Sequence, residues 1–167
     1  MRLGWIFASI VLLVLLAAPA HAAADDLADE FSVVNESNPV TWINRGVDFF
    51  NLGQTEDAIE AYDRAIALNS QYSAAWNNKG VALISQGKYD EAIQACDEAI
   101  RLYPEYASSW NNKGFALMSQ GKYDEAIQAY DEAIRLDSED ATAWNGKGFA
   151  LMRQGKYDEA IQAYDEA

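Results

Sequence analysis

Histidine and cysteine, the side chains most often used as catalytic base and nucleophile, are rare in this chain of 167 residues. It contains one histidine, His21, and one cysteine, Cys96. His21 lies in an N-terminal segment that we expect to be removed, so the remaining chain offers no Ser-His-Asp or Cys-His pair and no imidazole metal ligand. A single cysteine also excludes an internal disulfide and a zinc site built from several cysteines. We therefore predict a protein that is not an enzyme, with no catalytic residue, metal site or cofactor.

Carboxylates are the commonest reactive groups, with 26 Asp and Glu against 12 Lys and Arg and a formal charge of -14. Such a charge repels the phosphate backbone and argues against nucleic acid as a partner. We interpret the acidic pairs as a solvated outer face; the alternatives are weak divalent-cation binding and attraction to a basic partner. They lie in expected helices rather than in a glycine-bearing loop, which excludes an EF-hand calcium site. The pairs are Asp90-Glu91, Asp97-Glu98, Asp124-Glu125, Asp131-Glu132, Asp158-Glu159 and Asp165-Glu166.

The N-terminal residues carry the pattern of a secretory signal peptide. Arg2 is basic, residues 3–20 are uncharged, and Ala20-His21-Ala22 forms a small-x-small cleavage site. We predict a signal peptide over residues 1–22, with cleavage after Ala24 as the second choice. The alternative is an uncleaved membrane anchor, because the uncharged run reaches spanning length. We expect the mature protein to be secreted, periplasmic or at the cell surface, without membrane contact after cleavage.

The rest of the chain repeats itself. The block QGKYDEAIQAYDEA occurs at residues 120–133 and again unchanged at 154–167, and the copy at 86–99 differs only by Cys96. Tryptophan recurs every 34 residues, at Trp42, Trp76, Trp110 and Trp144. Self-similarity at a fixed period of this length indicates a repeat architecture. We divide the chain into an acidic leader (23–38) and units at 39–72, 73–106, 107–140 and 141–167, the last of them incomplete.

Each unit is predicted to form two helices. In the second unit, Trp76, Gly80 and Leu83 recur at helical spacing, and Gly87 supplies the left-handed residue that ends a helix. The segment after Gly87 has acidic residues in its first turn and an apolar face beginning at Ala92. A lone helix pair cannot cover its apolar face, so the pairs must stack. The predicted fold is all-α, a right-handed α-solenoid of stacked antiparallel helix pairs.

The order of residue types within each unit resembles the tetratricopeptide repeat. In the second unit the matching residues are Trp76, Gly80, Ala92, Cys96 and Pro104. The resemblance covers residues 39–167. It departs from the family pattern where a leucine is expected, since Arg45, Lys79, Lys113 and Lys147 stand there, and where Ser70 and Ser138 replace the proline.

The resemblance implies a peptide- or protein-binding groove lined by the first helix of each unit. Asparagine can both donate to and accept from an extended backbone, and Phe and Met offer adaptable apolar contact. The alternative for the Phe and Met positions is a seam between adjacent units. The implied groove residues are Asn77, Val81, Ile84, Asn111, Phe115, Met118, Asn145, Phe149 and Met152.

Two other residue types have a structural and a functional interpretation. The repeated tryptophans are expected in the core, with sugar stacking as the alternative. Cys96 replaces a tyrosine of the other units and is expected to be a small buried side chain, with an intermolecular disulfide as the alternative.

We therefore predict a non-enzymatic scaffold outside the cytoplasm that binds a protein or peptide segment in the groove. Two alternatives stay open. The chain could be the repeat region of a longer protein whose activity lies downstream of Ala167. It could also be a structural surface protein that self-associates through an uncapped C-terminal repeat.

Overall fold

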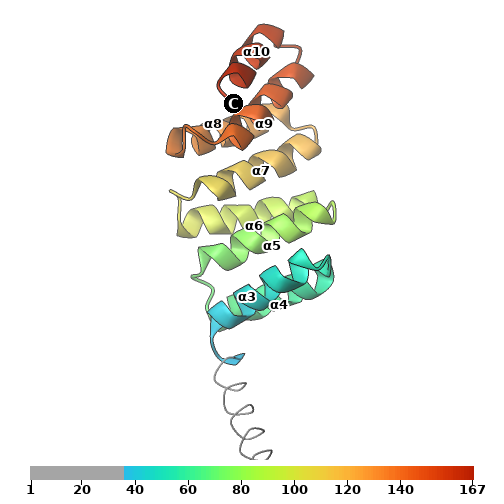
Figure 1. Cartoon of the computed structure of the whole chain (residues 1–167), viewed down its shortest axis with the longest axis vertical. Coiled ribbons are helices and arrows are strands. Elements are labelled where there is room, and N and C mark those ends of the chain that lie inside the picture. Colours follow the sequence, from blue (N-terminus) through green and yellow to red (C-terminus); the bar gives the residue numbers. More distant parts are fainter. Residues whose placement is uncertain (1–35) are drawn as a thin grey trace, which may run out of the picture. The chain divides into compact units, whose positions relative to one another are not determined.

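The computed structural model describes residues 36–167. The predicted signal peptide and almost all of the acidic leader lie outside the described residues. From Pro39 onwards the chain forms a single compact unit with eight α-helices and no strand. The helices, labelled as in Figure 1, are α3 (Pro39–Asn51), α4 (Thr55–Leu68), α5 (Ser73–Ser85), α6 (Tyr89–Leu102), α7 (Ala107–Ser119), α8 (Tyr123–Leu136), α9 (Ala141–Arg153) and α10 (Tyr157–Asp165).

The helices are arranged as stacked pairs within this unit. Helices α3 and α4 pack together, as do the three later pairs, and each pair contacts the next through the first helix of the latter. Figure 1 shows the pairs following one another in chain order from α3 to α10. The first helices begin at Pro39, Ser73, Ala107 and Ala141, the residues at which the sequence units start.

A glycine with positive φ ends the first helix of each pair. Gly87 has φ 73°, a conformation that costs glycine little because it has no Cβ. The Gly87 N–H donates to the Ile84 carbonyl at 2.9 Å, and the Lys88 N–H donates to the Leu83 carbonyl at 3.0 Å. These bonds satisfy the last carbonyls of α5 and turn the chain directly into α6.

Small residues let the helices approach closely. Ala75 and Ala82 of α5 are fully buried and pack in clusters with residues of α4. Within a pair, a Cβ built on Gly114 would lie 2.9 Å from the ring of Tyr130. A larger side chain at Gly114 would therefore have to displace that ring. The core is thin and rich in alanine, with Leu and Tyr filling the remaining space.

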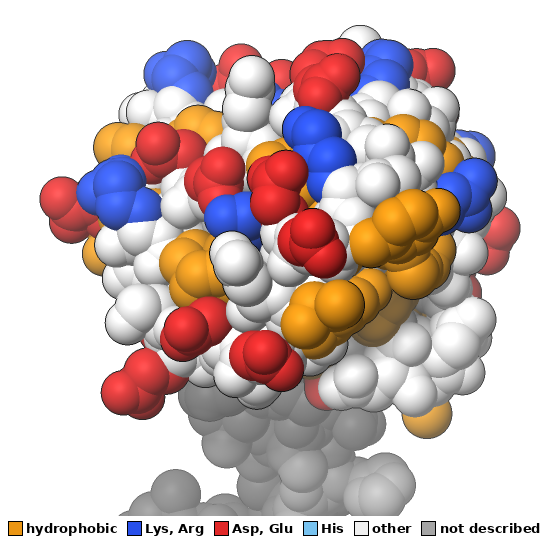
Figure 2. Space-filling model, turned by 90° about the horizontal axis from the view of Figure 1, so that it is seen from above, with side chains coloured by type: hydrophobic (Ala, Val, Ile, Leu, Met, Phe, Trp, Pro, Cys, Tyr) orange, Lys and Arg blue, Asp and Glu red, His pale blue; other side chains and the backbone are white. Residues whose placement is uncertain are grey.

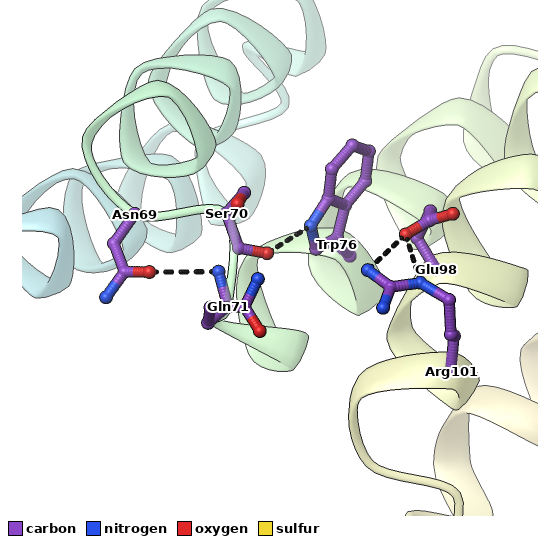
Figure 3. A network of polar contacts seen from close by, with 6 residues as sticks. All are labelled: Asn69, Ser70, Gln71, Trp76, Glu98 and Arg101. Atoms are coloured by element: carbon purple, nitrogen blue, oxygen red, sulfur yellow. Dashed lines mark hydrogen bonds and ion pairs between the residues drawn. The ribbon is translucent and has the colours of Figure 1, made fainter.

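Each tryptophan from the second unit onward fixes the loop that precedes it. Figure 3 shows the Trp76 indole N–H donating to the Ser70 carbonyl, at 3.0 Å. Beside it, Asn69 Oδ1 accepts from the Gln71 N–H and closes the same turn. The equivalent indole bonds reach Pro104 and Ser138 at 2.9 and 3.0 Å. The tryptophans are partly buried and serve as structural anchors between pairs.

Three of the basic residues that depart from the family pattern link consecutive pairs. Lys79 Nζ lies 2.6 Å from Asp63 Oδ1 on α4, and its ammonium is 5.8 Å from the centre of the Trp76 ring. Lys113 and Lys147 repeat this arrangement with Asp97 and Asp131, both at 2.7 Å. Because these pairs remain partly exposed, each contributes modestly to stability.

Cys96 is fully buried where the other units have tyrosine. Its sulfur would lie 2.9 Å from a Cβ built on Gly80, so it occupies the place that the Tyr130 ring occupies beside Gly114. Burial raises the pKa of the Cys96 thiol to about 12, with the nearby Asp97 carboxylate adding to the rise. An intermolecular disulfide would require this part of the array to open first.

Candidate binding groove

The first helices bring apolar side chains to equivalent places on the array. Phe115 and Phe149, one repeat apart, are 44% and 38% exposed, and Met152 is 38% exposed. Val81, Ile84 and Met118 are partly buried. Met118 packs against the α8 cluster and accepts a weak hydrogen bond from the Tyr130 hydroxyl at 3.9 Å. The predicted Phe and Met positions therefore combine seam contacts with solvent exposure, the exposure being greatest at Phe115.

One further residue extends this surface toward the first unit. Val47 of α3 is exposed and precedes Val81 by one repeat. The sequence-based set of groove residues omitted it, although the 34-residue step, applied backwards from Val81, leads directly to Val47. The exposed apolar groove residues are Val47, Phe115, Phe149 and Met152, here named the groove stripe.

The first helices carry almost no negative charge. Helices α5, α7 and α9 contain no Asp or Glu, whereas their partner helices carry the repeated acidic pairs. Lys79, Lys113 and Lys147 are occupied by carboxylates of the preceding second helices. Arg153 lies against aromatic rings instead: its guanidinium is 5.4 Å from the centre of the Tyr123 ring and 6.0 Å from that of Phe149. The surface beside the groove stripe is thus weakly polar, with a cation at its α9 end.

Asn77 is buried rather than open to a ligand. Its side chain is 5% exposed, and its Oδ1 accepts from Ser109 Oγ and from Asn112 Nδ2, both at 3.0 Å. Ser109 is fully buried. Asn77 therefore joins α5 to α7 through a buried polar network.

The other two asparagines have different partners. Asn111 Nδ2 donates to Asp140 Oδ2 at 3.1 Å, and Asp140 Oδ1 in turn accepts the backbone N–H groups of Thr142 and Ala143 as the N-cap of α9. Asn145 is exposed and donates to the Ala141 carbonyl of its own helix at 2.8 Å. The three asparagines share a sequence position but do not form one uniform row, because their neighbours differ from unit to unit.

A set of hollows, distinct from the groove stripe, lies between the tryptophans and the second helices. One of about 500 Å³ is lined by Trp110, Lys113 and Leu117 from α7 and by Glu125 and Glu132 from α8. Equivalent hollows occur beside Trp42, Trp76 and Trp144. The lysine of the hollow at Trp110 is already paired with Asp97. These hollows recur because the repeat geometry recurs.

The described residues show neither a metal cluster nor a spanning helix. Within residues 36–167, no three His, Cys, Asp or Glu side chains converge as metal ligands. In the same range, no helix is long and apolar enough to span a bilayer.

Comparison with known proteins identifies the repeat. A family model described as tetratricopeptide repeat matches residues 43–107 and 112–167, and a second model of the same description matches residues 95–128. Two MamA crystal structures are similar: one is 28% identical with a TM-score of 0.73, over 78% of this chain and 71% of that one. The other is 26% identical with a TM-score of 0.76, over 83% and 81%.

A more distant match shows the fold alone. The first tetratricopeptide repeat domain of the human RPAP3 protein is 18% identical with a TM-score of 0.70, over 74% of this chain and 98% of that one. No curated protein matches the chain significantly. Together with the eight helices, these matches confirm the predicted all-α solenoid of stacked helix pairs.

Proposed function

Because the chain belongs to the tetratricopeptide repeat family, we propose that it is a non-enzymatic scaffold that binds a protein segment along the groove stripe. The observation that carries this proposal is the exposure of large apolar side chains on first helices that lack acidic residues, in a protein whose formal charge is -14. Isolated exposed apolar residues are ordinary, but a row repeated along one face is typical of an interaction surface.

The chemistry of the stripe defines the partner segment. Phe115, Phe149 and Met152 offer apolar and polarisable contact, which suits aliphatic or aromatic side chains spaced along a peptide. Asn145 and Asn111 lie on the same helices and can exchange hydrogen bonds with a peptide backbone. Arg153 favours an acidic or neutral group over a basic one near Phe149. We propose a segment with apolar anchors and no basic residue at that end.

A photo-crosslinking experiment tests the groove. A photoreactive phenylalanine analogue replaces Phe115 in one version of the protein and Leu68, an exposed apolar residue at the end of α4, in a matched version. We expect a defined crosslinked partner from the Phe115 position alone. With that purified partner, Phe115→Ala should weaken binding about tenfold, as expected for an aromatic anchor, while Leu68→Ala leaves it unchanged. Equal binding by the Phe115 variant would contradict the proposal.

The proposed location is outside the cytoplasm. This rests on the signal pattern of residues 1–22 and on nothing in the described array. Mass spectrometry of the protein isolated from its native cell should give a chain that begins at Ala23 or Asp25, the residues after the two predicted cleavage points. A chain that begins at Met1 and remains in the cytoplasmic fraction would contradict it.

A further inference from the structure

The hollows beside the tryptophans keep equivalent linings in the first three units, with one reversal of charge. Each is lined by a tryptophan and by one face of the second helix of its unit. Where the first unit has Arg64, the second and third units have Glu98 and Glu132. The two hollows with glutamate belong to the interior of the array, one to the pair α5 and α6 and the other to α7 and α8.

In the first unit the chain itself occupies the hollow. The Arg64 guanidinium lies 4.8 Å from the centre of the Trp42 ring, and its Nη2 is 3.0 Å from Oε1 of Glu60. Arg45 approaches the same ring at 4.7 Å, so one tryptophan accommodates two cations. The space left in this hollow is about 200 Å³. A guanidinium is thus a group that this structure already places over a tryptophan and beside an acidic helix face.

The equivalent place is open in the next two units. The hollows beside Trp76 and Trp110 measure about 430 and 500 Å³. Among the described residues, one cation lies near each ring, Lys79 at 5.8 Å and Lys113 at 5.7 Å from the ring centres. Each of these lysines corresponds in the repeat to Arg45. The position of the other arginine of the first unit is held by a glutamate, which leaves room for a cation from outside.

The second helices of these units present acceptors for such a cation. Glu91, Gln94 and Glu98 line one face of α6 at intervals of three and four residues. Figure 3 shows Glu98 together with Trp76; the two contacts from Arg101, at 2.9 and 2.8 Å, both go to Oε2 of Glu98 and neither uses Oε1. Within residues 36–167, Glu91 forms no ion pair. The third unit repeats this face with Glu125, Gln128 and Glu132.

Charge and shape both favour arginine as the occupant. The formal charge is -14, and Figure 2 shows acidic side chains spread over the visible end of the array, with Lys and Arg between them. This excess attracts a basic segment. Residues 23–38 contain no Lys or Arg, so the acidic leader does not supply one. Arginine suits the hollow better than lysine, because its planar guanidinium stacks on an aromatic ring while its N–H groups reach two acceptors at once.

We propose that the hollows beside Trp76 and Trp110 each bind an arginine side chain of a basic segment from another protein. The guanidinium stacks on the indole and donates to Glu and Gln side chains of the second helix, as Arg64 does with Trp42 and Glu60. Neither hollow is lined by a residue of the groove stripe. The scaffold therefore has a second binding surface, whose chemistry differs from that of the groove.

Nuclear magnetic resonance of the isotope-labelled protein tests each tryptophan separately. The indole N–H signals are assigned with single Trp→Phe variants, and the probe is the blocked tripeptide Gly-Arg-Gly. One matched peptide carries lysine, which keeps the charge, and another carries citrulline, which keeps the shape without the charge. We expect the arginine peptide to shift the Trp76 and Trp110 signals in a saturable way. The Trp42 signal should stay in place, because Arg64 already covers that ring.

The matched peptides separate stacking from simple attraction of charge. We expect the lysine peptide to bind about threefold more weakly than the arginine peptide, since an ammonium gains less from the indole and from the two acceptors. The citrulline peptide should bind at least about tenfold more weakly, because it loses the charge as well.

A charge swap copied from the first unit provides the matched variant. Gln94→Glu with Glu98→Arg gives the second unit the residues of the first, so the new arginine should cover Trp76 and weaken the effect of the peptide there at least about tenfold. The Trp110 response in the same sample should stay unchanged, which also shows that the variant is folded. Gln128→Glu with Glu132→Arg should abolish the Trp110 response and leave that of Trp76.

Any one of four results would overturn the proposal. The first is the absence of a saturable shift at both indoles at tens of millimolar arginine peptide. The second is an equal effect of the lysine peptide, or an equal response of Trp42, since general attraction of charge would then explain the shifts. The third is a Trp76 response that survives the charge swap. The fourth is a dimer in analytical ultracentrifugation that the swap dissociates, because the arginine would then come from a second copy of this chain.

Discussion

The buried network around Asn77 yields a prediction about stability. Asn77→Ala removes the acceptor of two hydrogen bonds, from Ser109 Oγ and Asn112 Nδ2, each of 3.0 Å. Ser109 is fully buried, so its hydroxyl loses its partner without gaining water, whereas the partly buried Asn112 can be hydrated. Leaving a buried donor unsatisfied costs about 1–3 kcal/mol. With a smaller loss at Asn112, we expect Asn77→Ala to lower the free energy of unfolding by about 2–3 kcal/mol.

A second substitution separates this cause from simple loss of packing. Ala75 and Ala143 occupy the position of Ser109 in two other units and are fully buried, so Ser109→Ala fits the site. In the double variant no hydroxyl is left without a partner. We expect Ser109→Ala, added to Asn77→Ala, to recover about 1–2 kcal/mol.

Urea denaturation followed by far-UV circular dichroism measures the single and double variants against the unmodified protein. The slope of free energy against urea concentration must stay constant for the comparison to hold. A loss below about 0.5 kcal/mol for Asn77→Ala, or a double variant no more stable than the single one, would refute the role assigned to the buried hydroxyl.

Three further predictions concern packing, titration and capping. Gly114→Ala should destabilise the array by about 1–2 kcal/mol, because the new methyl group would meet the buried Tyr130 ring, which α9 holds in place. Gly148→Ala should be neutral or stabilising, because the ring it faces, Tyr164, is exposed and can move aside. Thermal unfolding compares the two variants. Burial raises the pKa of Cys96 from 9.0 to about 12. Between these pH values the thiol ionises only in the unfolded chain, so the free energy of unfolding should fall as pH rises, and Cys96→Ala should make this fall smaller. Asp140→Ala removes the N-cap of α9 and should cost about 1–2 kcal/mol by urea denaturation, against no change in the matched Ser138→Ala variant.

The repeated unit made the fold predictable from the sequence. Trp76, Gly80 and Gly87 recur with a fixed step, and each has a local role: an anchor to the preceding loop, close contact with the paired helix, and the end of the first helix. These roles depend on residues nearby in the chain or one repeat away. The 34-residue periodicity of the sequence is therefore enough to predict these roles.

The groove was less predictable because exposure depends on neighbours that vary between units. Asn77 and Asn145 look equivalent in the sequence, yet Asn77 meets Ser109 and Asn112 on the next first helix. Helix α9 is followed by no further first helix in the described chain, and Asn145 is exposed. The packing of the next first helix, with its Ser109 and Asn112 side chains, thus makes the Asn77 position a buried one. The prediction that the remaining groove residues bind a peptide stays a prediction.

The identity of α8 and α10 also bears on how the chain finds its order during folding. Two interchangeable second helices carry no information about which unit they belong to, so a partly folded chain could pack one in place of the other. The hydrogen-bonded trio of Asn77, Ser109 and Asn112 closes only when α5 and α7 are adjacent. A stack in which another first helix took the place of α7 beside α5 would leave the Asn77 side chain without these partners. The network therefore fixes the order of α5 and α7, which the second helices do not specify.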